Sequence, residues 1–409
     1  MTPVAPVRPE WEVADVIREY GEAFESRQGG RLGGSQMQAL RDLARCRTAA
    51  LGGHVERCLD CGRDRIAYNS CRNRHCPKCQ ARTRARWLAE QARHLLPVEY
   101  FHVVFTLPAE IAELALENRV ALYDLLFQSA AATLREVAAN PKRLGAQPGV
   151  LMVLHTWGQN LHHHPHVHTV VTGGGLSCDV RGNVKEPPRW SSCRKGFFLP
   201  VRVLSRVFRG KYLEGVRKLF DAGRLSLPGR WREFANPLAF SRWLTPLYHQ
   251  DWMVYAKRPF GGPEQVLKYL ARYTHRVAIS NSRLVDVSNG RVSFHYKDYA
   301  DDRRIKTMTL TADEFLRRFV QHVLPKGFVK IRHYGLLANR CREERLALCR
   351  RLLLVENVRV ALSEGVAERA SVETVRCCPH CGSRRMVCMA LPSLEGNKVA
   401  DSLVKIDTS

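Results

Sequence analysis

Two cysteine pairs of the Cys-x2-Cys type constrain the N-terminal part of this chain more than any other sequence feature. Cys58 and Cys61 form the first pair, and Cys76 and Cys79 form the second after fourteen intervening residues. Each pair can present two thiolates from one tight turn, and four thiolates complete the tetrahedron that zinc prefers. The spacing therefore predicts a structural zinc site held by these four residues, with redox chemistry of the thiols as the weaker alternative.

Four further residues of zinc-binding types lie in the same stretch. Together with the two pairs they make eight potential ligands, which is enough for two tetrahedral sites. We therefore expect a second, interleaved zinc site held by Cys46, His54, Cys71 and His75. The alternative is that some of these four are buried residues or only support the ligands. Near the C-terminus, candidates for a further zinc ion are Cys377, Cys378, Cys381 and Cys388.

The charge of the chain indicates the class of partner. Lysine and arginine total 64 against 39 acidic residues, and the resulting net charge of +25 is spread along the chain. Such an excess repels itself unless a polyanion neutralises it, so nucleic acid is the expected partner. Basic residues surround the second cysteine pair, and we expect DNA contacts there from Arg72, Arg74, Lys78 and Arg82. The alternative is a solvated basic surface.

Length and apolar content predict two or three domains, because 409 residues with 45% hydrophobic side chains can form several cores. The sequence contains no run of about 18 apolar residues that would predict a membrane span. The N-terminus also lacks the apolar segment of a signal peptide. We therefore expect a cytoplasmic protein. Fourteen cysteines in such a protein favour metal sites over disulfides.

The segment LHHHPHVHTVVTGGG, residues 161–175, has five histidines within seven positions. Its TVV portion favours a β-strand, in which side chains two positions apart lie on the same face. His166 and His168 therefore project together while Val167 points into a core, an arrangement suited to a divalent metal ion. The alternative is a surface histidine cluster. The closing glycines indicate either a turn or the close approach of a ligand backbone.

A helix predicted over residues 261–277 carries two tyrosines four positions apart. Tyr269 and Tyr273 therefore share one face. A tyrosine oxygen is a weak nucleophile at neutral pH, but a metal that polarises the electrophile and nearby cations make it useful. The same helix carries cationic side chains at Lys268, Arg272 and Arg276, which we expect to contact DNA. On this pattern alone, tyrosines are more often ordinary core residues.

Strands and helices alternate through the middle of the chain, which fits an α+β fold. Residues 100–107 and 150–157 are predicted strands, and the second should form an antiparallel hairpin with the histidine segment. One long helix is expected over residues 109–139. A hairpin turns at Asn289 and Gly290, and a capping box at Thr311 and Glu314 begins another helix.

Taken in order, these motifs resemble the rolling-circle transposases of the IS91 insertion-sequence type. The resemblance covers about residues 38–342 and rests on SCRNRHCPKCQAR, YFHVVFTLP, HTWGQNL with HPHVHTVVTGGG, YLARYTHR and KGFVKIRHYGLLANR. It implies an antiparallel-sheet HUH endonuclease domain preceded by a small zinc-binding domain. In such enzymes two histidines bind catalytic Mg²⁺ or Mn²⁺, here His166 and His168, and the nucleophiles correspond to Tyr269 and Tyr273.

The resemblance also implies a reaction, in which single-stranded DNA at transposon ends is nicked and rejoined through a 5′-phosphotyrosine during rolling-circle transposition. We expect a zinc-binding, DNA-contacting domain at 1–95, the catalytic domain at 96–345, and a basic helix with a cysteine-containing tail at 346–409. Enzymes of this class use a third metal ligand, for which the nearby candidates are His155, Gln159 and His164.

Two absences limit the mechanism. The sequence has no Gly-x4-Gly-Lys-Ser/Thr loop, so no nucleotide cofactor is expected and any unwinding would fall to a host helicase. It also has no acidic triad at recognisable spacing for transposases that use carboxylates and two metals. The alternative function is a non-catalytic, zinc-dependent DNA-binding regulator. Such a regulator would have no use for the tyrosine helix.

Overall fold

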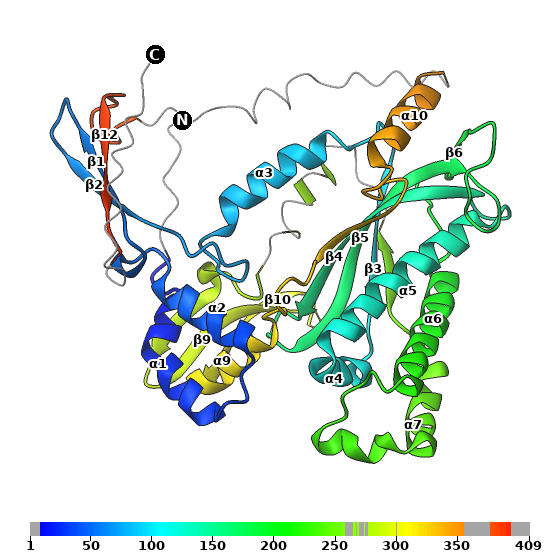
Figure 1. Ribbon diagram of the computed structural model, residues 1–409, viewed down its shortest axis with the longest axis horizontal. Coiled ribbons are helices and arrows are strands. Elements are labelled where there is room, and N and C mark those ends of the chain that lie inside the picture. The colour runs from blue at the N-terminus through cyan, green and yellow to red at the C-terminus, as the bar shows by residue number, and fades with distance from the viewer. Residues whose placement is uncertain are drawn as a thin grey trace.

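The computed structural model describes residues 9–257, 265–266, 268–269, 274, 277–299, 301–355 and 377–393, apart from the side chains of residues 81, 82 and 355. The strands within these ranges form three sheets, and helices pack against two of them (Figure 1). Every strand pair is antiparallel. The structure therefore confirms the predicted α+β fold with an antiparallel sheet.

The largest sheet contains β3 (Tyr100–Thr106), β4 (Ala146–Trp157), β5 (His163–Ser177), β6 (Trp190–Ser192), β7 (Val254–Lys257) and β11 (Ile331–Gly335). Its order is β11-β4-β5-β3-β7, with β6 paired to β5 beside this path. The predicted hairpin is confirmed, because β4 and β5 pair in antiparallel register. The histidine segment thus forms a central strand.

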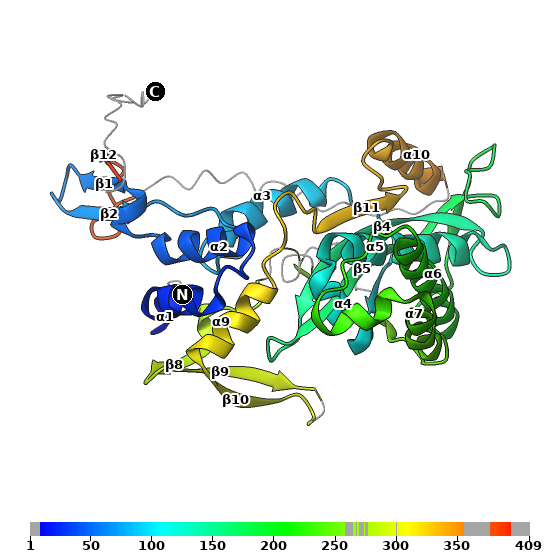
Figure 2. The same cartoon turned by 60° about the horizontal axis from the view of Figure 1, so that its bottom comes forward.

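Four helices cover one face of this sheet: α4 (Ala109–Glu117), α5 (Arg119–Ala139), α6 (Val201–Asp221) and α7 (Pro237–Leu244). In Figure 2, α4 and α5 lie against β4 and β5. Next to them, α6 packs against α5 and β7, and α7 packs against α6. The buried core between the layers includes Val103 and Phe105 of β3 together with Val167 and Val171 of β5. Because strand side chains alternate, the residues directly before and after Val167 project from the opposite face. This alternation places His166 and His168 on the face away from these helices.

The long helix predicted over residues 109–139 is interrupted at Asn118, and this prediction was wrong at that point. The side-chain amide of Asn118 donates to the carbonyls of Leu114, at 3.2 Å, and Ser226, at 2.9 Å. Its side-chain oxygen accepts the N–H of Ser226 at 2.7 Å. These bonds satisfy backbone groups at the break, which explains why two shorter helices replace one.

The N-terminal helices share a core with a segment that begins about 240 residues downstream. These helices are α1 (Val13–Gln28) and α2 (Gly34–Arg45), and their partners are β8 (Leu284–Ser288), β9 (Arg291–Asp298), β10 (Arg304–Thr311) and α9 (Ala312–Gln321). Phe24 and Leu40 are buried in one cluster with Phe294 and Phe315. The predicted cap of α9 is confirmed, since the Thr311 hydroxyl accepts the N–H of Glu314 at 3.2 Å.

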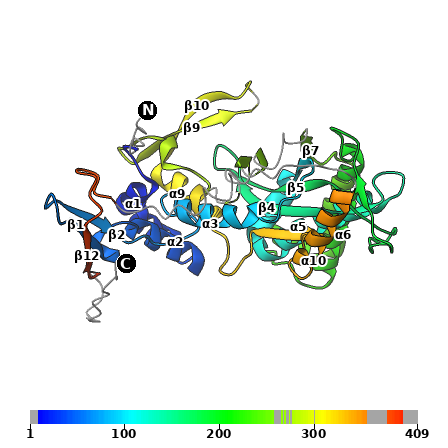
Figure 3. The ribbon, with the colours of Figure 1, turned by 90° about the horizontal axis from the view of Figure 1, so that it is seen from above.

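The third sheet joins two distant parts of the sequence. β1 (Gly53–Cys58) and β2 (Asp64–Tyr68) form a hairpin, and β12 (Met386–Leu391) pairs with the other edge of β1. In Figure 3, the red β12 lies beside the blue β1. Two further α-helices of the described ranges are α3 (Gln80–Ala92), which packs Trp87 and Leu88 near the large sheet, and α10 (Arg342–Val355). No helix in the described ranges is long and apolar enough to cross a membrane.

The three glycines after the histidines continue β5 and do not end it in a turn. A Cβ atom at Gly175 would lie 2.2 Å from the backbone oxygen of Gln147, and one at Gly173 would lie 2.8 Å from that of Glu99. Both contacts are too short for any side chain. The close approach that the glycines allow is therefore between the protein's own strands, and not with a ligand.

Candidate functional site

Three histidines from two neighbouring strands meet on the open face of the large sheet. His166 of β5 lies opposite His155 of β4 in the strand register, and His168 follows two positions along β5. One ring nitrogen from each histidine lies within 4.8 Å of the others, and the Nε2 atoms of His166 and His168 are 3.2 Å apart. The register therefore supplies His155 as the third member of the group. Of the other candidates, His164 is not a member of this group, and both His164 and Gln159 line the same cleft as the three histidines.

The orientation of His166 suits metal binding. Its Nδ1 donates a hydrogen bond to the carbonyl oxygen of His164 at 2.7 Å, so the lone pair of the neutral ring lies on Nε2. Nε2 is the atom that faces His168. A backbone carbonyl that holds the far nitrogen of a histidine is a common support for a metal ligand. His155 is almost fully buried, which keeps its ring fixed beside the other two.

Tyr269 is the described tyrosine that reaches this group. Its hydroxyl oxygen contacts Nδ1 of His168 at 3.1 Å and also Nε2 of His102. The phenol oxygen therefore lies on the far side of His168 from His166. The other predicted nucleophile, Tyr273, lies outside the described residues, as do Arg272 and Arg276. Lys268 lies in the same helical segment as Tyr269.

His102 of β3 is a site residue that the sequence reasoning missed. Its Nε2 lies 3.0 Å from Nδ1 of His168, and the two rings stack with centroids 5.2 Å apart. Burial, together with the nearby Lys257, lowers the pKa of His102 to about 3, so the ring is neutral. The alternation of YFHVVFT carries a signal for it, because His102 shares a sheet face with Val104, the register partner of His168.

A cleft of about 650 Å³ opens over the histidines. Its floor is the histidine face of the sheet, and one wall is the segment from Trp157 to Asn160. Tyr296 of β9 and Tyr299, just after this strand, also line the cleft, and Tyr299 is largely exposed. Aromatic rings beside a polar floor can stack successive bases of a single strand.

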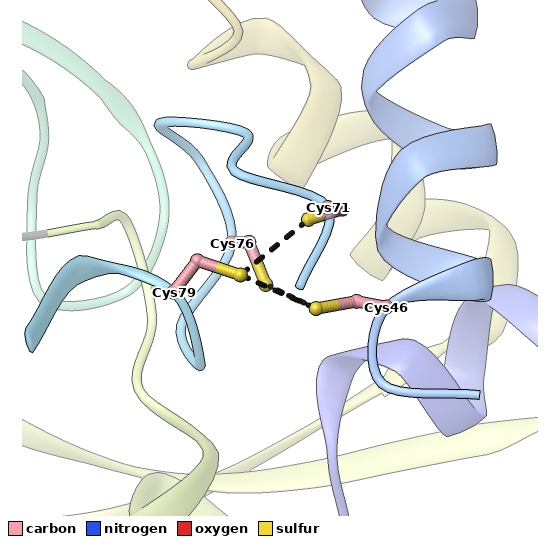
Figure 4. Close-up of side chains that lie close together, drawn as sticks. All are labelled: Cys46, Cys71, Cys76 and Cys79. Atoms are coloured by element: carbon pink, nitrogen blue, oxygen red, sulfur yellow. Dashed lines mark hydrogen bonds between the residues drawn. The ribbon is translucent and has the colours of Figure 1, made fainter. Parts of the chain in front are cut away.

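The predicted zinc ligands form different groups in the structure from the two groups that were expected. Cys76 and Cys79 lie with Cys46 and Cys71, and the four sulfurs are within 4.8 Å of one another (Figure 4). The Sγ of Cys79 is 3.3 Å from that of Cys46 and 3.6 Å from that of Cys71. This group packs against the shared core of α1, α2 and α9, because Cys46 and Cys76 are buried in that core.

Cys58 and Cys61 are separated from this group by the length of β1. A six-residue strand spans about 20 Å, which carries Cys58 away from Cys46. The first pair lies instead near Cys378 and Cys381, and the predicted tetrahedron of the two N-terminal pairs is not formed.

The two predicted histidine ligands also lie outside the cysteine groups. His75 is half-buried, and its Nε2 accepts the backbone N–H of Leu324 at 3.3 Å. His54 lies on β1, with its Nε2 3.3 Å from a carboxylate oxygen of Glu56. The alternative raised for these residues, buried or supporting roles, therefore fits the structure better than ligation.

Two of the basic residues expected to contact DNA have partners inside the protein. The Arg74 guanidinium donates to the carbonyls of Phe328, at 2.5 Å, and Pro325, at 2.7 Å. Lys78 forms a half-buried ion pair with Glu12. Arg72 is exposed, and the side chain of Arg82 lies outside the described residues. Among the cysteine-loop residues described, Arg72 is thus the better candidate for a phosphate contact.

Comparisons with known proteins agree on one family. The family model described as "Transposase zinc-binding domain" matches residues 16–107, and the model described as "Putative transposase" matches residues 149–345. The chain is 51% identical to "Putative transposase y4qJ" of Sinorhizobium fredii over 92% of this chain and 94% of the relative. It is 30% identical to "Transposase for insertion sequence element IS801" of Pseudomonas savastanoi pv. phaseolicola, over 76% and 72% respectively. No solved structure gives a significant match.

Proposed function

The chain belongs to the IS91-type transposases, and we propose that it nicks and rejoins single-stranded DNA at transposon ends through a 5′-phosphotyrosine intermediate. The observation that carries the proposal is the contact between the Tyr269 hydroxyl and His168, a member of the three-histidine group. A DNA-binding regulator would not need a nucleophile beside a candidate metal site. The relatives' names support DNA as the substrate class.

The residues that would hold the catalytic metal are His155, His166 and His168. Their donor set fits a divalent cation, because one ring nitrogen from each histidine converges on the same place. In His166, the other ring nitrogen is hydrogen-bonded to a backbone carbonyl, which holds the ring in this orientation. Bound there, such a cation would withdraw charge from a phosphate oxygen and stabilise the charge that develops during cleavage. Imidazole ligands suit Mn²⁺ better than Mg²⁺, which prefers oxygen.

Tyr269 supplies the nucleophile in this proposal. Its oxygen attacks the scissile phosphorus and releases its proton to water, and the bond from phosphorus to the 3′ oxygen breaks. The leaving oxygen takes up a proton and becomes a 3′-hydroxyl, while the 5′-phosphate stays bound to the tyrosine. His102 and His168 contact the phenol oxygen and hold it in place for attack. Reversal with another 3′-hydroxyl rejoins the strand at little cost in bond energy.

Single-stranded DNA fits the cleft and the charge. Aromatic walls can stack unpaired bases, and an unpaired strand avoids the cost of opening a duplex inside the site. The net charge of +25 favours binding of the backbone. Because the sequence has no phosphate-binding loop of the NTPase type, we assign strand separation to a host helicase.

The test is an adduct assay. Labelled single-stranded oligonucleotides that cover the ends of the element encoding this chain are incubated with the full-length protein and Mn²⁺. A protein–DNA adduct that survives boiling in detergent is expected, and peptide mapping should place DNA on Tyr269 or Tyr273. The adduct should be lost in His166→Ala/His168→Ala, which removes two of the three proposed ligands.

The matched control is Tyr68→Phe, which removes an exposed phenol from β2 without touching the histidine face. Its adduct yield should equal that of the wild type. Adduct formation at full yield in the variant that combines Tyr269→Phe with Tyr273→Phe would overturn the proposal. Tight DNA binding with no adduct under any metal would instead support the regulator.

A further inference from the structure

Two cysteine knuckles from opposite ends of the chain face each other beside β1. Cys58 and Cys61 belong to the N-terminal hairpin, whereas Cys378 and Cys381 precede β12. Their four sulfurs lie within 4.8 Å of one another. The segment from 377 to 393 lies outside both family matches, which cover residues 16–107 and 149–345. We propose that these four cysteines bind one structural zinc ion, so that the C-terminal segment completes the N-terminal ribbon.

The two knuckles have the same local construction. In the first, the N–H of Gly62 bonds to the carbonyl of Cys58 at 2.9 Å, and in the second, Gly382 bonds to Cys378 at the same distance. Both glycines have positive φ, 69° and 75°, a backbone conformation that residues with a side chain rarely adopt. Two Cys-x2-Cys-Gly turns of one shape, placed face to face, are the arrangement of a closed structural zinc site.

The spacing of the sulfurs fits zinc and not disulfides. Zn–S bonds of about 2.3 Å in a tetrahedron give sulfur–sulfur edges of about 3.8 Å. The observed separations are 3.5 Å from Cys58 to Cys381 and 3.6 Å from Cys61 to Cys378. A disulfide requires about 2.05 Å. All four sulfurs remain close enough together for one ion to contact them.

The surrounding contacts bring the two ends together in a defined register. β1 and β12 pair over six residues, from Gly53 opposite Leu391 to Cys58 opposite Met386. Between the knuckles, the Asp60 carboxylate accepts bonds from Arg385, at 2.8 Å, and from Ser383. These contacts are specific to this pairing of segments, and they place the four cysteines at one end of the sheet.

The other C-terminal cysteines supply an internal control. Cys388 lies within β12 opposite Glu56 and is exposed, and Cys377 precedes the knuckle and is also exposed. Neither belongs to the four-cysteine group. A zinc ion bound as proposed should therefore depend on Cys378 and Cys381 and not on their neighbours.

Zinc per full-length chain is measured by mass spectrometry of the purified protein kept in a reducing buffer. Cys378→Ser/Cys381→Ser should contain one zinc ion fewer than the wild type, and so should Cys58→Ser/Cys61→Ser. The variant that combines all four substitutions should also lose one and not two, because both pairs serve the same ion. The control Cys377→Ser/Cys388→Ser should keep the wild-type content.

Unchanged zinc in Cys378→Ser/Cys381→Ser would overturn the proposal, and loss of two ions in the combined variant would assign the pairs to separate sites. Alkylation of the wild type avoids any folding defect of the variants. All four thiols should be protected when zinc is bound and should become reactive together during chelation. Reaction of Cys378 and Cys381 in the zinc-loaded protein would refute the shared site. Both outcomes are independent of the nicking assay.

Discussion

Arg74 offers a sharp test, because its sequence context suggests DNA binding while its contacts suggest a structural role. We consider Arg74→Met, which keeps most of the side-chain stem and removes the guanidinium. The wild-type group donates to the carbonyls of Phe328, at 2.5 Å, Pro325, at 2.7 Å, and Leu324, at 3.4 Å. Hydrogen bonds from a charged donor contribute about 1.5–3 kcal/mol each. Counting the two short bonds and discounting for partial exposure, we expect a loss of about 2–4 kcal/mol.

The assay pairs thermal unfolding with DNA binding. A loss of this size should lower the Tm of Arg74→Met by roughly 5–10 °C. Affinity for single-stranded DNA, measured across a salt series at a temperature where both proteins are folded, should be unchanged. Arg72→Ala is the matched comparison, since Arg72 is exposed in the same loop. It should keep its Tm and reduce the slope of log affinity against log salt by about 0.7. An Arg74→Met protein with normal Tm and a reduced slope would refute the structural role.

Three further predictions follow from other contacts. His102→Ala should reduce the rate of adduct formation roughly 10- to 100-fold with DNA affinity unchanged, because it removes one support of the Tyr269 oxygen; an unchanged rate would contradict that role. Burial lowers the pKa of His322 to about 4, so below pH 6.5 the unfolded chain binds a proton that the folded chain excludes. Stability is therefore full above pH 6.5 and is lost as pH falls toward 4, and the Tm of His322→Gln should fall less over pH 6.5–4.5 than that of the wild type. Gly175→Ala should lower the free energy of unfolding, measured by chemical denaturation, by at least about 1–3 kcal/mol, since its Cβ would meet the Gln147 oxygen at 2.2 Å. Gly34→Ala has open space around the added Cβ and should not lower the free energy of unfolding.

Local patterns predicted the parts of the candidate site that lie on one strand. The two-residue spacing of His166 and His168 implies a shared face, and Val167 is buried beneath them. The side chain of Thr311 likewise caps its helix. These features depend on the geometry of a single strand or helix end, which a few consecutive residues determine.

The parts that were left open or missed depend on which segments become neighbours. His155, one of three candidates for the third ligand, joins the histidine group only because the register of β4 and β5 sets it opposite His166. Cys58 meets Cys378, a residue 320 positions later, because β12 pairs with β1. The eight predicted ligands lie close together in the sequence, which made two zinc sites plausible. In the structure, however, β1 separates the sulfurs of Cys58 and Cys61 from those of the other cysteines. Spacing within one segment does not reveal such pairings.

The core shared by α1, α2 and α9 has a consequence for how the protein is made. The apolar faces of residues 13–45 leave the ribosome about 240 residues before β8, the first strand of their partner sheet. At 5–20 residues per second, that interval is on the order of 10–50 s. During this time the nascent chain exposes Phe24 and Leu40 without their partners. The end of β9, which walls the histidine cleft, emerges in the same late period. A product that stops before Tyr299 therefore lacks a finished cleft, because the last residues that line it have not been made.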